Sequence, residues 1–459
     1  MGTRVPAGAD GPDARGFAAF ADELAAGYPP AFAHLAWQLY RLTRGDSPVG
    51  PLRARQRAFA PFTLEYLFAA PRPPLPEDRR ADVLVTFFPA RPDYAGLLAP
   101  VAAELTRRGV AVGTLLPTES ADPGLPGPAL RLGSYAGPRA YAAARARWAV
   151  LTGHARRFAA RHGLDAEGRA ALALLLHNYA WQEATSRAAL EDVRPRVVLG
   201  LHFMTDPGLR AGVETTRARP RPRVVLLQHG LFSGEWPTHD FHGADLVMLW
   251  GEASREELAR FPDPPAAVVV GNPRLAGAGR VGPATVDDAP VVLVAGTNGD
   301  PEVSRRALST ALGALRELPG VRVRVRPHPR EPRSVYEGAR ADGLLTDDML
   351  DASPDPYDAV RGASVVVGTF STLLPEAIAL GVPAVQVVED GADLWWTGGM
   401  AAAASPADLR AVVARLVSDE AYRADVLARE APTARAAFGE HARAASLAAD
   451  AVLDEMERG

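Results

Sequence analysis

Two segments of the sequence place polar side chains where a phosphate group could be bound. In the first, Ser371 and Thr372 follow a short apolar run and precede a helix-like stretch, with Glu376 one turn further along. A helix N-terminus favours an anion through its free N–H groups and its dipole, and two hydroxyl groups add donors. Glu376, on the same face, could accept hydrogen bonds from ribose hydroxyls. The alternative is a helix that Ser371 caps, with Glu376 solvated.

The second segment is Arg326-Pro327-His328-Pro329, which also follows an apolar run. Its prolines restrict the backbone and aim His328 from the carboxyl end of the expected strand. His328, with Arg326 beside it, can donate charge-assisted hydrogen bonds to a phosphate or a leaving group. A glycine-containing turn further upstream could add a backbone nest for the same phosphate, through Gly296 and Asn298. The alternatives are a structural His and an ordinary tight turn.

A third segment offers a general base. His229 precedes Gly230, which permits a tight turn, at the end of another strand-like run. A neutral imidazole near physiological pH is suited to deprotonating an acceptor hydroxyl, although a structural His is the alternative. The loop that follows could line the acceptor site through Trp236, His239 and Asp240. His and Asp side chains can bind metals, but their spacing matches no metal-site signature, so we expect no metal site.

The composition excludes several classes of site. The chain has no Lys and no Cys, so all 50 of its basic residues are Arg. A Walker-type P-loop and a Schiff-base lysine are therefore excluded, as are disulfides, thiolate metal sites and a cysteine nucleophile. With 54 acidic residues and a formal net charge of -4, the chain also lacks the basic footprint of a non-specific nucleic-acid binder.

Short apolar runs that alternate with helix-like stretches predict two α/β domains. We expect an N-terminal helical segment and two Rossmann-like domains, the first for the acceptor and the second for the nucleotide donor. The ranges are 1–79 for the helical segment, 80–272 for the first domain, 273–289 for a linker, 290–430 for the second domain and 431–459 for a C-terminal helix. The strands expected in the second domain are Val291–Ala295, Val321–Arg326, Leu344–Thr346, Val365–Gly368 and Ala384–Val388. Ligands of such sheets bind at the carboxyl ends of the strands, where the polar residues above lie.

The stretch 290–416 resembles the nucleotide-binding domain of glycosyltransferases with the GT-B fold. Its His-Pro segment and its Ser371-Thr372 pair are similar to motifs of bacterial sialyltransferases, capsule polysaccharide enzymes and the polymerases that use CDP-glycerol. The segments 228–230 and 271–273 look like parts of the same capsule-type group. Sialyltransferases also carry an acidic base motif in the N-terminal domain, which is missing here and shifts the base role to His229.

The resemblance implies two Rossmann-like domains that face each other across a cleft, with N-terminal and C-terminal helices. It implies transfer of a sugar from a nucleotide-activated donor, such as a CMP-sugar, to a hydroxyl group in surface polysaccharide or glycoconjugate biosynthesis. We expect an inverting reaction without a metal or another cofactor, in which His229 is the base. The groups expected to neutralise the leaving phosphate are His328, Ser371, Thr372 and Arg326.

Other functions and several properties stay open. The alternatives are a UDP-N-acetylglucosamine 2-epimerase-like enzyme, a CDP-glycerol-type glycerophosphotransferase and a non-catalytic GT-B scaffold. The expected partners are the donor and a glycan or small-molecule acceptor, and no nucleic acid. No apolar run reaches the about 20 residues that span a bilayer, and we expect a cytoplasmic protein. Weak attachment to a membrane surface, the oligomeric state, the donor, the acceptor and the stereochemical course stay open.

Overall fold

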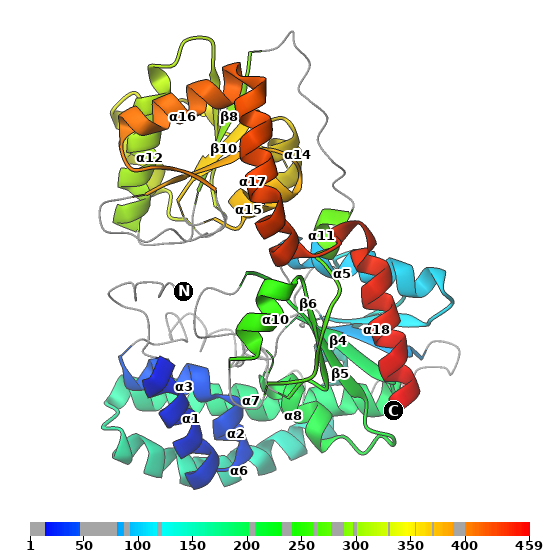
Figure 1. Cartoon of the computed structure of the whole chain (residues 1–459). Coiled ribbons are helices and arrows are strands. Elements are labelled where there is room, and N and C mark those ends of the chain that lie inside the picture. Colours follow the sequence, from blue (N-terminus) through cyan, green and yellow to red (C-terminus); the bar gives the residue numbers. More distant parts are fainter. Residues whose placement is uncertain are drawn as a thin grey trace. The chain divides into compact units, whose positions relative to one another are not determined.

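The chain folds into two compact units (Figure 1). The N-terminal unit comprises residues 8–249, 254–273 and 443–459, and the C-terminal unit includes 250–253 and 274–442. The computed structural model describes residues 14–45, 80–86, 92–116, 122–201, 207–231, 241, 243–260, 264–276, 289–296, 301–328, 331–353, 355–369, 371–388 and 400–459. Of the expected helical segment 1–79, the described part is helical through residue 43, and the remainder lies outside the described residues.

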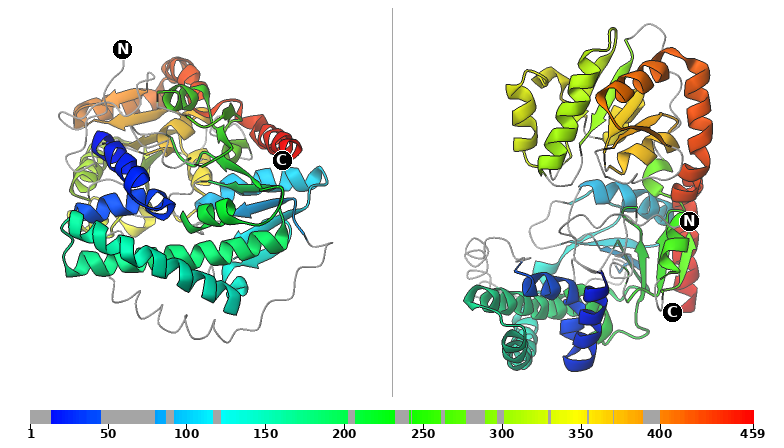
Figure 2. Two further views of the ribbon diagram at one scale, coloured as in Figure 1. Left: turned by 90° about the horizontal axis from the view of Figure 1, so that it is seen from below. Right: turned by 60° about the vertical axis from the view of Figure 1, so that its left-hand side comes forward.

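A seven-stranded parallel sheet forms the centre of the N-terminal unit, in the order β3-β2-β1-β4-β5-β6-β7. Its strands are β1 (Val83–Thr86), β2 (Val112–Leu116), β3 (Ala129–Arg131), β4 (Val197–Gly200), β5 (Arg223–Leu227), β6 (Leu246–Leu249) and β7 (Ala267–Val269). The central strands β1 and β4 are buried at every residue, as their apolar runs predict for strands covered on both faces. Figure 2 shows the helices on either side of this sheet.

A layer of helices is attached to this sheet. It consists of α1 (Ala14–Gly27), α2 (Pro30–His34), α3 (Ala36–Thr43), α6 (Pro138–Arg161) and α7 (Ala166–Val193). Buried aromatic side chains join the short N-terminal helices to the two long ones, among them Phe17, Phe32 and Phe158. The imidazole of His34 adds a polar tie, with Nδ1 2.8 Å from the Tyr179 hydroxyl and Nε2 3.0 Å from Glu214 Oε2.

Three further helices of the N-terminal unit pack against its sheet. They are α5 (Pro92–Arg107), α8 (Pro207–Thr215) and α18 (Ala444–Arg458). Although α18 follows the whole C-terminal unit in sequence, it packs on α5 and on the strands. Arg223 of β5 forms an ion pair of 2.8 Å with the buried Glu455 of α18. The helix α10 (Glu252–Leu258) follows β6, and α11 (Pro273–Ala276) follows β7.

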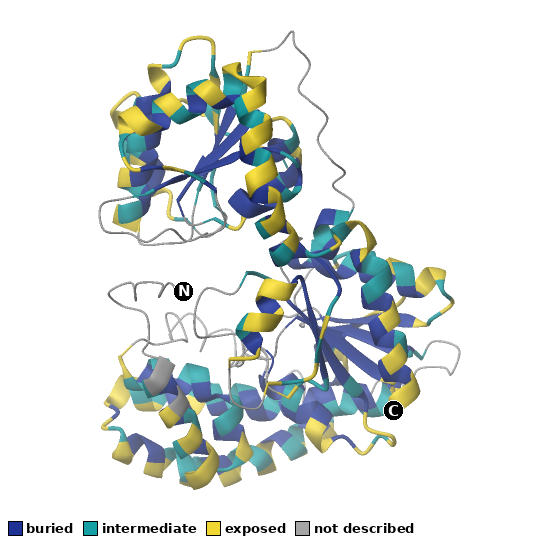
Figure 3. Cartoon of the chain, in the orientation of Figure 1, coloured by how far each residue is buried: buried dark blue, intermediate teal, exposed yellow. Residues whose placement is uncertain are grey.

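The C-terminal unit is built on a second parallel sheet, in the order β12-β11-β10-β8-β9. Its strands are β8 (Val291–Ala295), β9 (Arg322–Arg326), β10 (Val365–Gly368), β11 (Ala384–Val387) and β12 (Ala401–Ala403). Its helices are α12 (Pro301–Arg316), α13 (Ser334–Ala341), α14 (Pro356–Arg361), α15 (Leu373–Ala379), α16 (Pro406–Ser418) and α17 (Glu420–Phe438). In Figure 3 the central strands of each sheet are buried, whereas edge strands such as β7 and β9 include exposed residues.

One expected strand is wrong. Residues 344–346 form a turn, because the N–H groups of Leu344 and Leu345 both donate to the carbonyl oxygen of Ala339 at the end of α13. They are therefore not available to a sheet ladder. Further along the chain, an isolated bridge pairs Leu350 with Val325 of β9, and the N–H of Asp351 donates to the carbonyl oxygen of Val325 over 2.8 Å. None of the described helices combines the length and the apolar character needed to cross a bilayer.

Candidate functional site

Three neighbouring strands of the C-terminal sheet end at the same edge and place the predicted residues there. Gly296 follows β8, His328 lies two residues after β9, and Ser371 follows β10. Because β8 lies between β9 and β10, His328 and Ser371 belong to strand ends about 10 Å apart, twice the spacing of adjacent strands. The edge thus brings together three of the predicted contact points.

His328 lies in a turn that Glu331 and Tyr336 support. Neither residue is among those predicted from the sequence. The backbone N–H of His328 donates to Glu331 Oε2 over 3.3 Å, and its carbonyl oxygen accepts from the N–H of Glu331 over 3.0 Å. The same carboxylate oxygen accepts from the hydroxyl of Tyr336. The carboxylate three residues after the imidazole is visible in the sequence, and this spacing could have signalled such a turn.

Gly296 closes this cluster because it has no side chain. A Cβ atom there would lie 2.3 Å from Glu331 Oε2, 2.6 Å from the backbone nitrogen of His328 and 2.7 Å from the hydroxyl of Tyr336. Its own N–H donates to the carbonyl oxygen of Arg326 over 2.9 Å. A glycine is therefore required for the loop after β9 to approach the end of β8.

Arg326 is engaged by neighbouring groups of the protein. Its guanidinium donates to Asp351 Oδ2 and, over 2.9 Å, to the carbonyl oxygen of Ser353. The Asp351 side chain is almost fully buried and also accepts from the Ser353 hydroxyl over 2.7 Å. These contacts give Arg326 a structural role at the end of β9. Its expected contact with a phosphate stays a prediction.

The two hydroxyl-bearing residues precede α15. Thr372 is exposed, and its side chain forms no capping hydrogen bond in the described part of the chain. The Ser371 hydroxyl accepts a long hydrogen bond, 3.4 Å, from the N–H of Leu373. Both hydroxyls thus keep capacity for a ligand at the end of β10.

Glu376 faces the interior of the unit. It is 5% exposed, and its Oε1 accepts from the hydroxyl of Tyr357 over 2.9 Å. Burial raises the pKa of Glu376 to about 7, while Arg274 and the Tyr357 hydrogen bond act in the opposite direction. Arg274 lies over the Tyr357 ring, with Cζ 4.6 Å from its centroid. Ribose binding by Glu376 stays a prediction, and this burial does not favour it.

The proposed base, His229, lies in the N-terminal unit directly after β5. The preceding Gln228 is fully buried and donates to the carbonyl oxygen of Gly230 over 2.8 Å and to the hydroxyl of Ser254 over 2.9 Å. This fixes the turn that carries His229. The half-buried His229 ring packs edge-on against Tyr94, with ring centroids 5.7 Å apart.

Four predicted residues lie outside the described part of the chain. They are Asn298 and the acceptor-side candidates Trp236, His239 and Asp240. Among the residues that are described, no three His, Asp or Glu side chains come together in a way that could hold a metal ion.

Comparison with known proteins identifies the fold. No family model matches the sequence, and no curated protein matches it by sequence. A putative UDP-N-acetylglucosamine 2-epimerase from Listeria monocytogenes matches in structure with a TM-score of 0.55 at 14% identity, over 83% of this chain and 98% of the other. The epimerase from Neisseria meningitidis, solved bound to UDP-GlcNAc, matches with a TM-score of 0.51 at 13% identity, over 82% of this chain and 100% of the other.

Glycosyltransferases are also among the structural matches. The calicheamicin glycosyltransferase CalG4 matches with a TM-score of 0.46 at 18% identity, over 83% of this chain and 99% of the other. That likeness is too weak to carry an argument about function. The epimerase matches and the two parallel sheets together show that this chain has the GT-B fold.

Proposed function

We propose that this chain binds a nucleotide-activated sugar at the edge of the C-terminal sheet and transfers the sugar to a hydroxyl acceptor. The observation that carries the proposal is the shared edge, where His328, Gly296 and the Ser371-Thr372 pair follow neighbouring strands. Ligands of parallel α/β sheets bind at this edge. The support from outside this chain is that structural relatives of the same fold are named for UDP-GlcNAc, and one of them was solved with it.

The proposed reaction is a displacement at the anomeric carbon. The acceptor oxygen forms a bond to that carbon while the bond to the donor phosphate oxygen breaks, and the acceptor proton passes to the imidazole of His229. The phosphate leaves with the bonding electron pair. His328, Ser371 and Thr372 stabilise its developing charge by hydrogen bonds, which need no reorganisation if they are already in place. Displacement from the opposite face inverts the sugar.

The donor class follows from the resemblance of the two motifs to those of capsule and CDP-glycerol enzymes. We therefore propose a cytidine-linked donor first and a uridine-linked donor second, with a surface glycan as the acceptor. The supporting residues are the His-Pro pair at His328 and the hydroxyl pair at Ser371.

A second candidate is epimerisation of the donor itself, without an acceptor. The observation that favours it is that four structural matches with TM-scores of 0.51 to 0.55 are named as 2-epimerases. Their identity to this chain is 13 or 14%, which shows the fold and leaves the reaction open. Transfer yields a free nucleotide, whereas the product of epimerisation is still a nucleotide sugar.

Ligand-induced stabilisation tests the donor site. The wild type and His328→Ala are heated with CMP, CDP, UDP, GDP, TDP and ADP in turn. A nucleotide at a hundred times its Kd should stabilise the fold by about 2.7 kcal/mol. We expect a response to CMP or CDP that His328→Ala loses and that His154→Ala, on helix α6 of the other unit, retains. If no nucleotide raises the melting temperature of the wild type, the proposal is wrong and a scaffold role gains support.

An activity measurement separates the two candidates. The nucleotide sugar that stabilises the fold is incubated with the enzyme, alone and with glycan acceptors. Release of free nucleotide only with an acceptor supports transfer. Conversion to a second nucleotide sugar without an acceptor supports epimerisation instead.

A further inference from the structure

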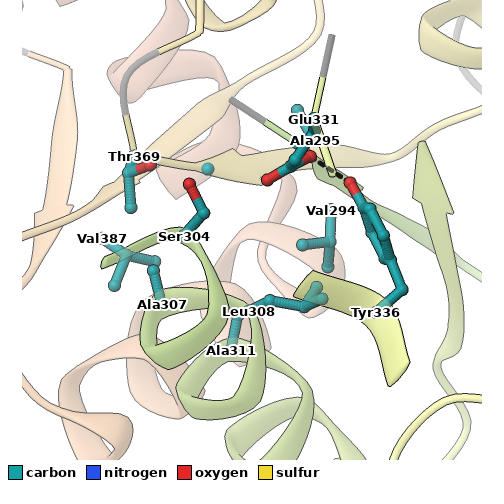
Figure 4. A pocket seen from close by; sticks show the side chains of 12 residues that line it. Val294, Ala295, Ser304, Ala307, Leu308, Ala311, Glu331, Tyr336, Thr369 and Val387 are labelled. Carbon is teal, nitrogen blue, oxygen red and sulfur yellow. Dashed lines mark hydrogen bonds between the residues drawn. The ribbon is translucent and has the colours of Figure 1, made fainter. Parts of the chain in front are cut away.

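A hollow lies at the carboxyl end of β8, next to the turn that carries His328. It is lined by apolar side chains together with the polar side chains of Ser304, Glu331, Tyr336 and Thr369. Figure 4 shows one carboxylate oxygen of Glu331 and the hydroxyls of Ser304 and Thr369 facing the same space. None of these four side chains has a role in the proposed transfer.

The Glu331 carboxylate is fixed in place and yet keeps one oxygen for a ligand. Its Oε2 accepts from the Tyr336 hydroxyl and from the N–H of His328. Burial and the neighbouring carboxylate raise the pKa of Tyr336, so the phenol stays a proton donor to Glu331. The other oxygen points into the hollow and accepts no hydrogen bond from the described residues.

The hydroxyl of Ser304 is a second, independent indication that a ligand binds in this hollow. It lies in the first turn of α12 and is 4% exposed. Its Oγ is buried and has no hydrogen-bond partner in the described part of the chain. Buried hydroxyl groups are nearly always hydrogen-bonded, so an unpaired one at the wall of a hollow points to a ligand atom or a water molecule there.

The negative charge of Glu331 indicates what kind of ligand group fits this hollow. A carboxylate oxygen only accepts hydrogen bonds when ionised, whereas the hydroxyls of Ser304 and Thr369 both donate and accept. An anion placed beside Glu331 would be repelled, and no described cation lines the hollow to offset that charge. A sugar hydroxyl fits, because it can donate to the carboxylate and accept from a neighbouring hydroxyl.

We propose that Glu331, oriented by Tyr336 and assisted by Ser304, binds a hydroxyl group of the donor, either on its ribose or on its activated sugar. This inference rests on the proposed function and deepens it. It places a hydroxyl group, and not the phosphate, over Gly296. The phosphate stays with His328, Ser371 and Thr372, as in the proposed transfer.

The direction in which one substitution changes affinity shows whether a hydroxyl group or the phosphate lies beside Glu331. Glu331→Gln keeps the size of the side chain and an oxygen that can accept from Tyr336, but it removes the negative charge. If a donor hydroxyl binds the carboxylate, titration calorimetry should show binding weakened about tenfold or more, the usual worth of a hydrogen bond to a charged group. If a phosphate lies there, the same change removes a repulsion and tightens binding.

Matched ligands and variants complete the test. If Glu331→Gln binds the nucleoside diphosphate more weakly than the wild type does, but binds the 2′,3′-dideoxy analogue equally well, the bound hydroxyl belongs to the ribose. If the variant loses affinity only for the nucleotide sugar, the bound hydroxyl belongs to the sugar. Ser304→Ala should weaken the same ligand, and Glu337→Gln, an exposed neighbour on α13, should change nothing. Unchanged or tighter binding by Glu331→Gln overturns this inference alone, provided that His328→Ala still loses the nucleotide. A wild type that binds no nucleotide overturns both the inference and the proposed function.

Discussion

In the described part of the C-terminal unit, two tyrosine–glutamate pairs lie in different surroundings. Tyr357 and Glu376 are enclosed between α14 and α15, with exposed fractions of 1% and 5%. Tyr336 and Glu331 form the same hydrogen bond at the edge of the sheet, where the half-buried carboxylate borders a hollow. A tyrosine bonded to a glutamate can thus stabilise a core in one place, and in another it can orient the carboxylate to accept a hydrogen bond from a ligand. The predictions below separate these two roles.

The largest effect is expected from removing the enclosed carboxyl group. Glu376→Ala leaves a cavity and takes the acceptor from the buried Tyr357 hydroxyl, so unfolding should cost about 4 kcal/mol less. Chemical denaturation of the purified chain measures this. Glu331→Ala should lose less than half as much, since its carboxylate lies at an edge. Equal losses would mean that both pairs belong to the core.

The pH dependence of stability is the second contrast. Burial raises the pKa of Glu376 from 4.5 to about 7, so the folded chain binds its proton more tightly than the unfolded chain does. The free energy of unfolding should therefore fall as the pH rises from about 4.5 to 7, by on the order of 3 kcal/mol from this group.

The control for the pH profile is the difference between the wild type and Glu376→Gln. Burial also raises the pKa of Glu430 on α17, to about 8. Because both proteins contain Glu430, its contribution cancels when one profile is subtracted from the other. The variant should show a flatter profile over the same pH range. Parallel profiles for the two proteins would contradict the assignment to Glu376.

The third effect concerns Gly296, where the backbone of β8 lies close to the loop that carries His328 and Glu331. Gly296→Ala introduces a Cβ 2.6 Å from the backbone nitrogen of His328, so the loop after β9 must shift. We expect a loss of about 2 kcal/mol in stability, as for other overpacked sites, together with loss of nucleotide binding. Gly313→Ala on α12, where a Cβ meets no atom within 4 Å, is the matched control and should keep both properties.

The smallest effect is expected from Tyr336, which is itself buried but is bonded to the half-buried Glu331. Tyr336→Phe removes one donor to Glu331, whose free oxygen borders the hollow, so stability should fall by about 1 kcal/mol. Tyr357→Phe should cost about twice that, because it leaves a buried carboxyl group without its donor. Thermal melting of the two variants side by side gives the comparison, and a larger loss for Tyr336→Phe would reverse our assignment of the two pairs.

The sequence predicts the sheets and their shared edge well, for a physical reason. Strands such as β4 and β10 are short apolar runs because both of their faces are covered, and parallel strands end at one edge. The positions of His328 and Ser371 after their strands follow from that rule. The rule does not give the order of the strands, and β8 lies between the strands that carry these two residues.

Side-chain partners distant in sequence could not be predicted. Arg326 is bound to Asp351, and Glu376 is bound to Tyr357, through contacts that depend on how the loops return to the sheet. From the sequence alone, both residues are therefore predicted to contact the ligand. Glu331 is not singled out, because a single carboxylate near a turn is usually solvated. The roles of all these residues in binding stay predictions.

The packing of α18 has a consequence for how the protein is made. The ribosome completes the sheet of the N-terminal unit first, but the buried Glu455 that pairs with Arg223 of β5 arrives only after the whole C-terminal unit has been synthesised. At the usual rates of 5–20 residues per second this delay is roughly ten to thirty seconds. During that time the strands that α18 contacts, β4, β5 and β6, lack this helix, and the second unit must emerge before the first can reach its final stability.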